Sequence, residues 1–224
     1  MLGIFDSGTG AYNALSIIRR HIKREDVIIL TDRKNAPYGT KSRREILRIS
    51  KENIETLRKL GARKILIACC TASTVYPLLE NTEREITCNS ITPTIERTRQ
   101  TGARRIVLLA TERTVKDGAF KALLQGTELT EISAQPLVKF IDEGARDGKV
   151  GTECRDYLTK LFPRIQQAQP ELIILGCTHF HSLRATIQKY CATPVISSAH
   201  EGAVAFLSNI KDELCEGART LHLS

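Results

Sequence analysis

The sequence predicts an α/β protein with mainly parallel sheets, built from two half-similar units. Short apolar runs alternate with amphipathic stretches along the 224 residues, a pattern typical of parallel strands joined by helices. The segments Ile65–Thr71 and Leu172–Thr178 share one design, in which an apolar strand is followed by a small residue, then by Cys and Thr. Gly-Ala-Arg followed by a basic residue leads a helix into a strand at Gly61 and again at Gly102. These repeats indicate two related lobes.

The first 101 residues contain four apolar runs and four amphipathic stretches, which predict strands and the helices that connect them. The expected strands are Leu2–Phe5, Val27–Leu30, Lys64–Ala68 and Ile86–Ile91, and the expected helices are Tyr12–Ile22, Arg43–Leu60, Ser73–Glu80 and Pro93–Thr101.

The remaining residues continue the same alternation. The expected strands are Arg105–Leu109, Glu171–Leu175 and Pro194–Ile196, and the expected helices are Ala119–Leu124, Thr152–Gln166, Ser182–Tyr190 and His200–Cys215.

The passage into the second lobe is expected between Thr94 and Gly102, because no long linker interrupts the rhythm elsewhere. Residues 1–94 together with 183–224 are therefore predicted to form one lobe, and residues 95–182 the other. The helix at His200–Cys215 should pack back on the first lobe.

Composition and charge fit a soluble globular protein, with 42% hydrophobic and 26% charged residues. Residues 1–60 carry +6 of the formal net charge of +8. Aromatic residues are only 5% and no nucleic-acid motif appears, so we interpret the charge as solvated helix faces and expect no nucleic-acid partner. No apolar run is long enough for a bilayer and no leader is evident, so we expect a cytoplasmic protein without a membrane partner.

The seven cysteines have no CxxC spacing and predict neither a zinc site nor a disulfide framework. Cys69 and Cys177 follow the two similar strands. Ligands of open α/β sheets bind beyond the carboxyl ends of the strands, so both thiols are expected at the rim of a cleft. A helix beginning there should lower each thiol pKa and offer N–H groups to a carboxylate. The remaining thiols, apart from Cys70, are interpreted as structural or incidental, and they are Cys88, Cys154, Cys191 and Cys215.

Two thiols on opposing lobes suit racemisation without a cofactor. One base must remove the α-proton of an amino acid, and one acid must deliver a proton to the opposite face. A thiolate and a thiol can do both and exchange roles in the reverse direction.

The chain resembles the glutamate racemases, of the cofactor-independent aspartate/glutamate racemase superfamily, nearly from end to end. The resemblance rests on widely separated motifs in the right order. These are Phe5-Asp6-Ser7-Gly8 with Gly10, Asp32 with Ala36-Pro37-Tyr38-Gly39, Ala68-Cys69 with Thr71-Ala72-Ser73, Ala110-Thr111-Glu112 with Thr114 and Gly118, and Leu175-Gly176-Cys177-Thr178-His179.

The resemblance implies two pseudo-symmetric lobes with the active site in the cleft between them, and it assigns catalytic residues. Cys69 and Cys177 would exchange protons with the substrate on opposite faces. Asp6 would assist the first cysteine and His179 the second, while Asp142 lies where the family has a Glu that also assists the second. An exposed acidic pair at a helix end remains an alternative for Asp142.

The resemblance also implies that a set of hydroxyls and backbone N–H groups binds the carboxylates and ammonium of a dicarboxylic amino acid. Such groups hydrogen-bond carboxylates without adding a competing base. Capping or turn roles suit several of the same residues. The residues are Ser7, Pro37, Tyr38, Gly39, Cys70, Thr71, Thr114 and Thr178.

The implied activity is interconversion of L- and D-glutamate, which would supply peptidoglycan synthesis in the cell wall of a bacterium. No pyridoxal phosphate, metal or nucleotide is implied as cofactor, and homodimers are common in the family. Cys70 stands where glutamate racemases have an Asn that contacts the substrate, so a weak thiol donor replaces an amide. This leaves two alternatives, a racemase or isomerase for aspartate or a broader set of amino acids, and a non-catalytic amino-acid-binding relative.

Overall fold

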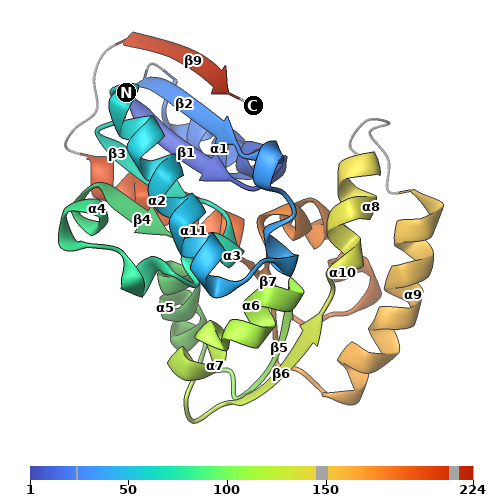
Figure 1. The fold of residues 1–224 in the computed structure, drawn as a ribbon. Coiled ribbons are helices and arrows are strands. Elements are labelled where there is room, and N and C mark those ends of the chain that lie inside the picture. Colours follow the sequence, from blue (N-terminus) through green and yellow to red (C-terminus); the bar gives the residue numbers. More distant parts are fainter. Residues whose placement is uncertain (24, 145–150, 212–216, 224) are drawn as a thin grey trace.

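Two parallel sheets form the framework of the computed structural model, which describes residues 1–23, 25–144, 151–211 and 217–223 (Figure 1). The strands are β1 (Leu2–Asp6), β2 (Glu25–Thr31), β3 (Lys64–Ile67), β4 (Thr87–Asn89), β5 (Arg105–Ala110), β6 (Glu128–Ser133), β7 (Leu172–Gly176), β8 (Val195–Ser197) and β9 (Gly217–Leu223). The α-helices are α1 (Gly10–His21), α2 (Arg43–Lys59), α3 (Cys70–Ser73), α4 (Asn81–Ile86), α5 (Ile91–Thr101), α6 (Glu112–Asp117), α7 (Ala119–Leu123), α8 (Pro136–Gly144), α9 (Thr152–Gln167), α10 (Arg184–Tyr190) and α11 (Ser198–Ile210). Short 3₁₀ helices are η1 (Arg33–Asn35), η2 (Tyr38–Thr40), η3 (Tyr76–Leu78) and η4 (Thr178–Leu183).

The first sheet has the strand order β4-β3-β1-β2-β9, and the second has the order β6-β5-β7-β8. Leu2 of β1 lies opposite Val27 and Lys64, and all pairs in both sheets are parallel. The carboxyl ends of parallel strands meet at one edge, so the loops that follow them gather there. This confirms the predicted α/β class.

Helices cover both faces of the first sheet. Alternate residues of β1 point to opposite faces, as the two-residue period of a strand requires. Phe5 packs with Ile46 of α2 on one face, whereas Ile4 packs with Phe206 of α11 and with α1 on the other. The chain therefore returns to the first sheet after the second is built, as predicted for the segment that begins at residue 200.

The second sheet has the same three-layer arrangement. Leu109 of β5 packs with Phe162 of α9 in a cluster that also contains residues of α8 and α10. Leu108, its neighbour in β5, faces the opposite side and packs with Phe120 of α7 and with α5. Each sheet is thus buried on both faces, which explains why its strands are almost continuously apolar.

The segment after β3 does not form the single helix predicted at Ser73–Glu80, so that prediction is wrong. It contains the end of α3, the 3₁₀ turn η3 and the loop before α4. Pro77 has no N–H and disfavours a continuous helix. The backbone N–H of Glu80 donates to the Glu83 carboxylate at 2.7 Å and starts α4 as a separate helix.

The predicted strand Ile86–Ile91 is shorter in the structure, where β4 has three residues. Asn89 ends it, because its Oδ1 accepts the backbone N–H groups of Ile91 and Thr92, each at 2.9 Å. These bonds cap free N–H groups at the amino end of α5, where the chain leaves the sheet.

Two strands, β6 and β9, have no counterpart among the predicted elements. β6 is an edge strand with alternating polar residues and only Ile132 fully buried. β9 pairs with β2, with Ile28 opposite Leu221. The predicted helix His200–Cys215 is observed as α11, which ends at Ile210, and residues 212–215 of the prediction lie outside the described ranges.

The lobe boundaries remain a prediction, but one strand pairs differently from that prediction. Strand β8 pairs with β7 in the second sheet, although residues 183–224 were assigned to the first lobe as a unit. In the described ranges, the cysteines are all free thiols, and Cys215 lies outside these ranges. None of the helices described is long and apolar enough to cross a membrane.

Candidate active site

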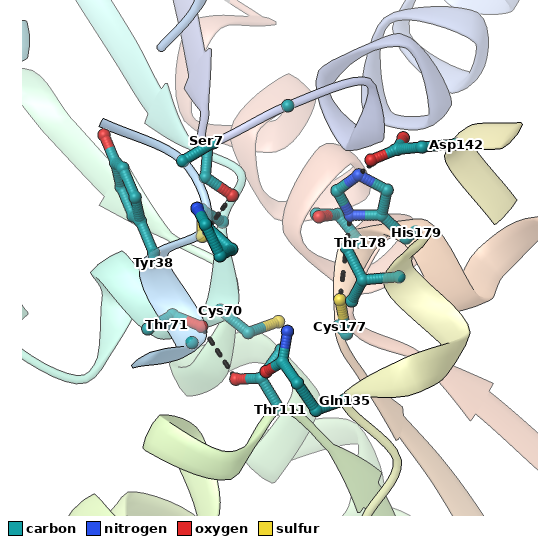
Figure 2. A pocket seen from close by; sticks show the side chains of 16 residues that line it. Ser7, Tyr38, Cys70, Thr71, Thr111, Gln135, Asp142, Cys177, Thr178 and His179 are labelled. Carbon is teal, nitrogen blue, oxygen red and sulfur yellow. Dashed lines mark hydrogen bonds and ion pairs between the residues drawn. The ribbon is translucent and has the colours of Figure 1, made fainter. Parts of the chain in front are cut away.

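A cavity of about 60 Å³ lies where the carboxyl ends of the two sheets face each other (Figure 2). Loops after β1, β2 and β3 line it from one lobe, and loops after β5, β6 and β7 from the other. Sites for drug-sized ligands have roughly 300–1,000 Å³, so this cavity suits a small metabolite. Its lining residues are Ser7, Gly8, Ala36, Pro37, Tyr38, Gly39, Cys69, Cys70, Thr71, Thr111, Gln135, Val138, Asp142, Cys177, Thr178 and His179.

Cys69 lines the cavity from the first lobe, at the amino end of α3. Its Sγ lies 3.7 Å from Ser7 Oγ. Burial raises the pKa of Cys69 to about 12, and the charges of Asp6 and Cys177 add to this, whereas the backbone N–H of Ala72 partly opposes it. The lowered thiol pKa predicted for this position is therefore wrong, because α3 is a single turn and burial outweighs it. Cys69 keeps its proton at neutral pH and can act as an acid.

Cys177 lines the opposite wall and begins a chain of three side chains. Its Sγ lies 3.8 Å from Nδ1 of His179, and Nε2 of His179 lies 3.3 Å from Oδ1 of Asp142 (Figure 2). The hydroxyl of Thr9 also donates a hydrogen bond to Asp142. The structure thus brings together Cys177 and His179, from the segment after β7, with Asp142 of α8.

His179 and Asp142 each shift the pKa of the other in the direction that favours its charged form. Burial lowers the pKa of His179, but the close ion pair with Asp142, followed by Cys177 and Asp6, raises it well above its ordinary value. Burial raises the pKa of Asp142, but the close ion pair with His179 outweighs burial and lowers it. An imidazolium paired with a carboxylate therefore stands beside Cys177, where it stabilises negative charge on the sulfur.

Asp6 is a fully buried carboxylate at the seam between the lobes. Its Oδ2 accepts a 2.7 Å hydrogen bond from Thr178 Oγ1, and its Oδ1 accepts the Gly8 N–H at 3.0 Å. Burial raises the pKa of Asp6, against the opposing charge of His179. Asp6 is outside the cavity lining and acts on Cys69 through its charge. The predicted catalytic aspartate is thus a buried neighbour of the site.

Three threonine hydroxyls meet across the two lobes beside the cavity. Thr71 Oγ1 lies 2.9 Å from Thr111 Oγ1 and 3.2 Å from Thr114 Oγ1, and Thr111 and Thr114 are 2.9 Å apart. Thr71 and Thr111 line the cavity, whereas Thr114 is fully buried and does not. The structure therefore presents Thr111 to a ligand where the sequence predicted Thr114.

The loop after β2 brings Pro37, Tyr38 and Gly39 to the cavity. The Tyr38 hydroxyl is directed away from it, because it donates to Asp32 Oδ2 at 2.6 Å and accepts from Asn53 Nδ2 at 2.9 Å (Figure 2). Tyr38 therefore anchors the loop to the core, and its hydroxyl does not face the cavity.

Cys70 is buried and lines the cavity beside Cys69. Burial and the charges of Cys177 and Cys69 raise the pKa of Cys70 well above its ordinary value, so it is a neutral thiol. Figure 2 shows its sulfur pointing into the cavity. The thiol at position 70 is therefore a group that a ligand meets.

The sequence reasoning missed Thr111, Gln135 and Val138, which all line the cavity. Gln135 immediately precedes α8, and together with Val138 and Asp142 it has the 3- and 4-residue spacing of one helix face. That spacing from the predicted Asp142 was the signal that could have found both residues. It went unused because the preceding strand β6 was not predicted.

Comparison with known proteins links this geometry to one family. The family model described as Asp/Glu/Hydantoin racemase matches residues 9–206. A glutamate racemase from Aquifex aeolicus (strain VF5) is 32% identical over 220 residues, which cover 95% of this chain and 84% of that protein. The match thus includes nearly all of the described site.

Two solved structures share the architecture. The glutamate racemase from Thermus thermophilus in complex with β-chloro-D-alanine has a TM-score of 0.79 and 25% identity, covering 99% of this chain and 86% of that one. The glutamate racemase from Francisella tularensis subsp. tularensis SCHU S4 in complex with D-glutamate has a TM-score of 0.86 and 21% identity, covering 100% and 88%.

Proposed function

Because the chain belongs to the Asp/Glu/hydantoin racemase family, whose activity is isomerisation, we propose that it interconverts L- and D-glutamate by two-base proton transfer. The observation that carries this proposal is the cavity lined by Cys69 on one lobe and by Cys177 on the other. The two thiols have different electrostatic surroundings, so one is suited to start as the acid and the other as the base.

Cys177 acts first as the base. Its thiolate, stabilised by the His179 imidazolium, takes the proton from Cα, and the electron pair left behind is delocalised into the α-carboxylate. Asp142 holds His179 in its charged form through the contact at 3.3 Å. Without this pair the thiolate would have no positive partner in the described wall of the cavity.

Cys69 then acts as the acid. Its thiol keeps its proton at neutral pH because burial and Asp6 raise its pKa. It delivers that proton to the opposite face of the planar carbanion, which inverts the configuration at Cα. Afterwards Cys69 is the thiolate and Cys177 the thiol, which are the states required for the reverse reaction.

Neutral donors bind the two carboxylates of the substrate. Among the residues that the structure describes, no Lys or Arg lines the cavity, so the hydroxyls of Ser7, Thr71 and Thr111, with nearby backbone N–H groups, supply the hydrogen bonds. Hydroxyls do not compete with the thiols as bases. The small cavity limits the substrate to the size of an amino acid.

D-Glutamate formed in this way would supply peptidoglycan synthesis in the cytoplasm of a bacterial host. The substrate and this physiological role follow from the resemblance to glutamate racemases and from the fit of the cavity to a small dicarboxylate.

The test is α-proton exchange in D₂O, followed by proton NMR and chiral chromatography, with glutamate and aspartate as separate substrates. We expect both enantiomers of glutamate to exchange and to converge on a racemic mixture, with aspartate much slower. The double variant Cys69→Ser/Cys177→Ser, purified from the same host, controls for a contaminating host racemase. Faster exchange of aspartate would overturn glutamate as the substrate, and absence of exchange would overturn the racemase proposal.

A further inference from the structure

Gln135 contributes the single carboxamide among the described residues that line the cavity. It lies between β6 and α8, so it enters the site from the second lobe, on the loop adjacent to that of Thr111. A carboxamide suits a carboxylate, since its NH₂ group has two N–H donors and no charge. Its orientation therefore matters for what the cavity can bind.

The oxygen of the Gln135 amide is already engaged. Its Oε1 lies 3.4 Å from the backbone N–H of Glu112, which donates to it. The same oxygen lies against Gly39 of the other lobe so closely that a Cβ there would be 2.0 Å away. The reverse orientation would place NH₂ against the N–H of Glu112, two donors facing each other, so the contact assigns the oxygen to this side.

The amide nitrogen is left as the free end of the side chain. In the described ranges, Nε2 of Gln135 has no hydrogen-bond acceptor, and Figure 2 shows it pointing into the space framed by Cys70 and Cys177. Two N–H donors in a cavity whose described wall contains no Lys or Arg are a ready partner for a negatively charged ligand.

Cys70, which lines the same cavity, makes the amide donor of Gln135 more important for binding. Glutamate racemases, which the chain resembles, have at that position an amide that contacts the substrate, and Cys70 has only a weak S–H donor. Among the described residues, the first lobe therefore lacks a carboxamide in its wall of the cavity, while the second lobe supplies one.

We infer that Gln135 is a substrate-binding and specificity-determining residue, which donates Nε2 to a carboxylate of the amino acid in place of the amide missing at position 70. This inference rests on the proposed racemase function. A carboxylate is the partner, because the ammonium group of the substrate needs an acceptor, whereas the amide oxygen already accepts the Glu112 N–H and lies against Gly39.

The experiment measures kcat and KM for glutamate racemisation with Gln135→Met, which keeps the length of the side chain but has no N–H donor. A hydrogen bond to a charged group is worth about 1.5–3 kcal/mol, or roughly 10- to 150-fold in binding. We expect KM to rise at least tenfold while kcat changes by less than about threefold. Gln135→Glu should raise KM further through repulsion of the carboxylate. Lys139→Ala, an exposed substitution in α8, the helix that follows Gln135, is the control and should leave both constants unchanged.

The double variant Cys70→Asn/Gln135→Met tests the exchange of roles directly. If the amide at 70 and that at 135 serve the same ligand group, Cys70→Asn should recover most of the KM lost by Gln135→Met, which a merely structural role would not produce. Thermal unfolding of each variant checks that the fold persists, and Gln135→Asn replaces Gln135→Met if it does not.

The outcomes separate this inference from the proposed function. A racemising wild type with KM unchanged in Gln135→Met, or with only kcat lowered, overturns the role of Gln135 and leaves the racemase function standing. A wild type that exchanges no α-proton of glutamate or aspartate overturns both.

Discussion

The hydroxyl of Thr178 donates a 2.7 Å hydrogen bond to Asp6 Oδ2 and so joins the loop of Cys177 to the end of β1. The two residues are 172 positions apart in the chain. Through this bond the wall that holds one thiol is attached to the lobe that holds the other. The separation of the two sulfurs therefore depends on a buried carboxylate.

Asp6 should make stability depend on pH in an unusual direction. Burial raises its pKa in the folded state, so the stability it contributes is complete below the unfolded pKa of about 3.9 and is lost as pH rises through the folded pKa. Asp6→Asn removes this titration. The free energy of unfolding of the wild type minus that of the variant should therefore decrease between pH 4.5 and 8, as measured by urea denaturation. A difference that is constant with pH would contradict the raised pKa.

Replacing either proposed acid–base thiol should abolish racemisation and leave the fold intact. Ser is nearly isosteric with Cys but is a far weaker acid, and loss of a general acid or base costs about 10²–10⁴ in rate. Cys69→Ser and Cys177→Ser should each lose at least about 10³-fold in kcat, measured by chiral chromatography. The control Cys191→Ser, whose thiol contacts the Ile187 carbonyl outside the cavity, should remain active. Full activity in both site variants would exclude the two-thiol mechanism.

Asp142 should set the alkaline limit of activity. It is the largest of the influences that raise the pKa of His179, so in Asp142→Asn the imidazolium should lose its proton at a lower pH. The alkaline limb of kcat/KM against pH should therefore begin at lower pH, and above that point activity should fall about tenfold for each further increase of one in pH. Glu143→Gln, on the exposed neighbour, should leave the profile in place. An identical profile for Asp142→Asn would argue against the pairing with His179.

Gly10 should tolerate no side chain, although it lies in an ordinary helical turn. A Cβ there would be 2.3 Å from Thr178 Oγ1 and 3.1 Å from Asp6 Oδ1. Gly10→Ala should cost about 1–3 kcal/mol through overpacking and should lower kcat by displacing the loop of Cys177. Gly151→Ala, where nothing lies within 4 Å, is the matched control for thermal unfolding and kinetics. Equal effects of the two substitutions would contradict this account of the seam.

The sequence was most informative where burial on both faces produces continuous apolar runs. Strands such as β1, β3, β5 and β7 were predicted to within one or two residues for that reason. β6 was missed because an edge strand with one exposed face contains polar residues, such as Glu128 and Ser133, that resemble a loop. Helix α8 was not predicted either, and so the position of Gln135, just before this helix, was missed.

The candidate site was predicted best for residues that belong to a motif after a strand. Cys69, Cys177 and His179 face one cavity as expected. Which hydroxyls reach the cavity could not be predicted, because it depends on rotamers and packing across two lobes. Thr111 rather than Thr114 lines it, and Tyr38 turns its hydroxyl toward Asp32.

The return of the last segment to the first sheet also determines when this site can exist during synthesis. Because α11 packs against α1 and β9 pairs with β2, the second lobe has to be synthesised before the amino-terminal sheet gains this helix and this edge strand. Domains that are continuous in sequence can fold as they emerge, whereas here the first lobe stays incomplete until the second has been made. Catalytic competence should therefore appear only after α11 and β9 have left the ribosome and packed on the first sheet.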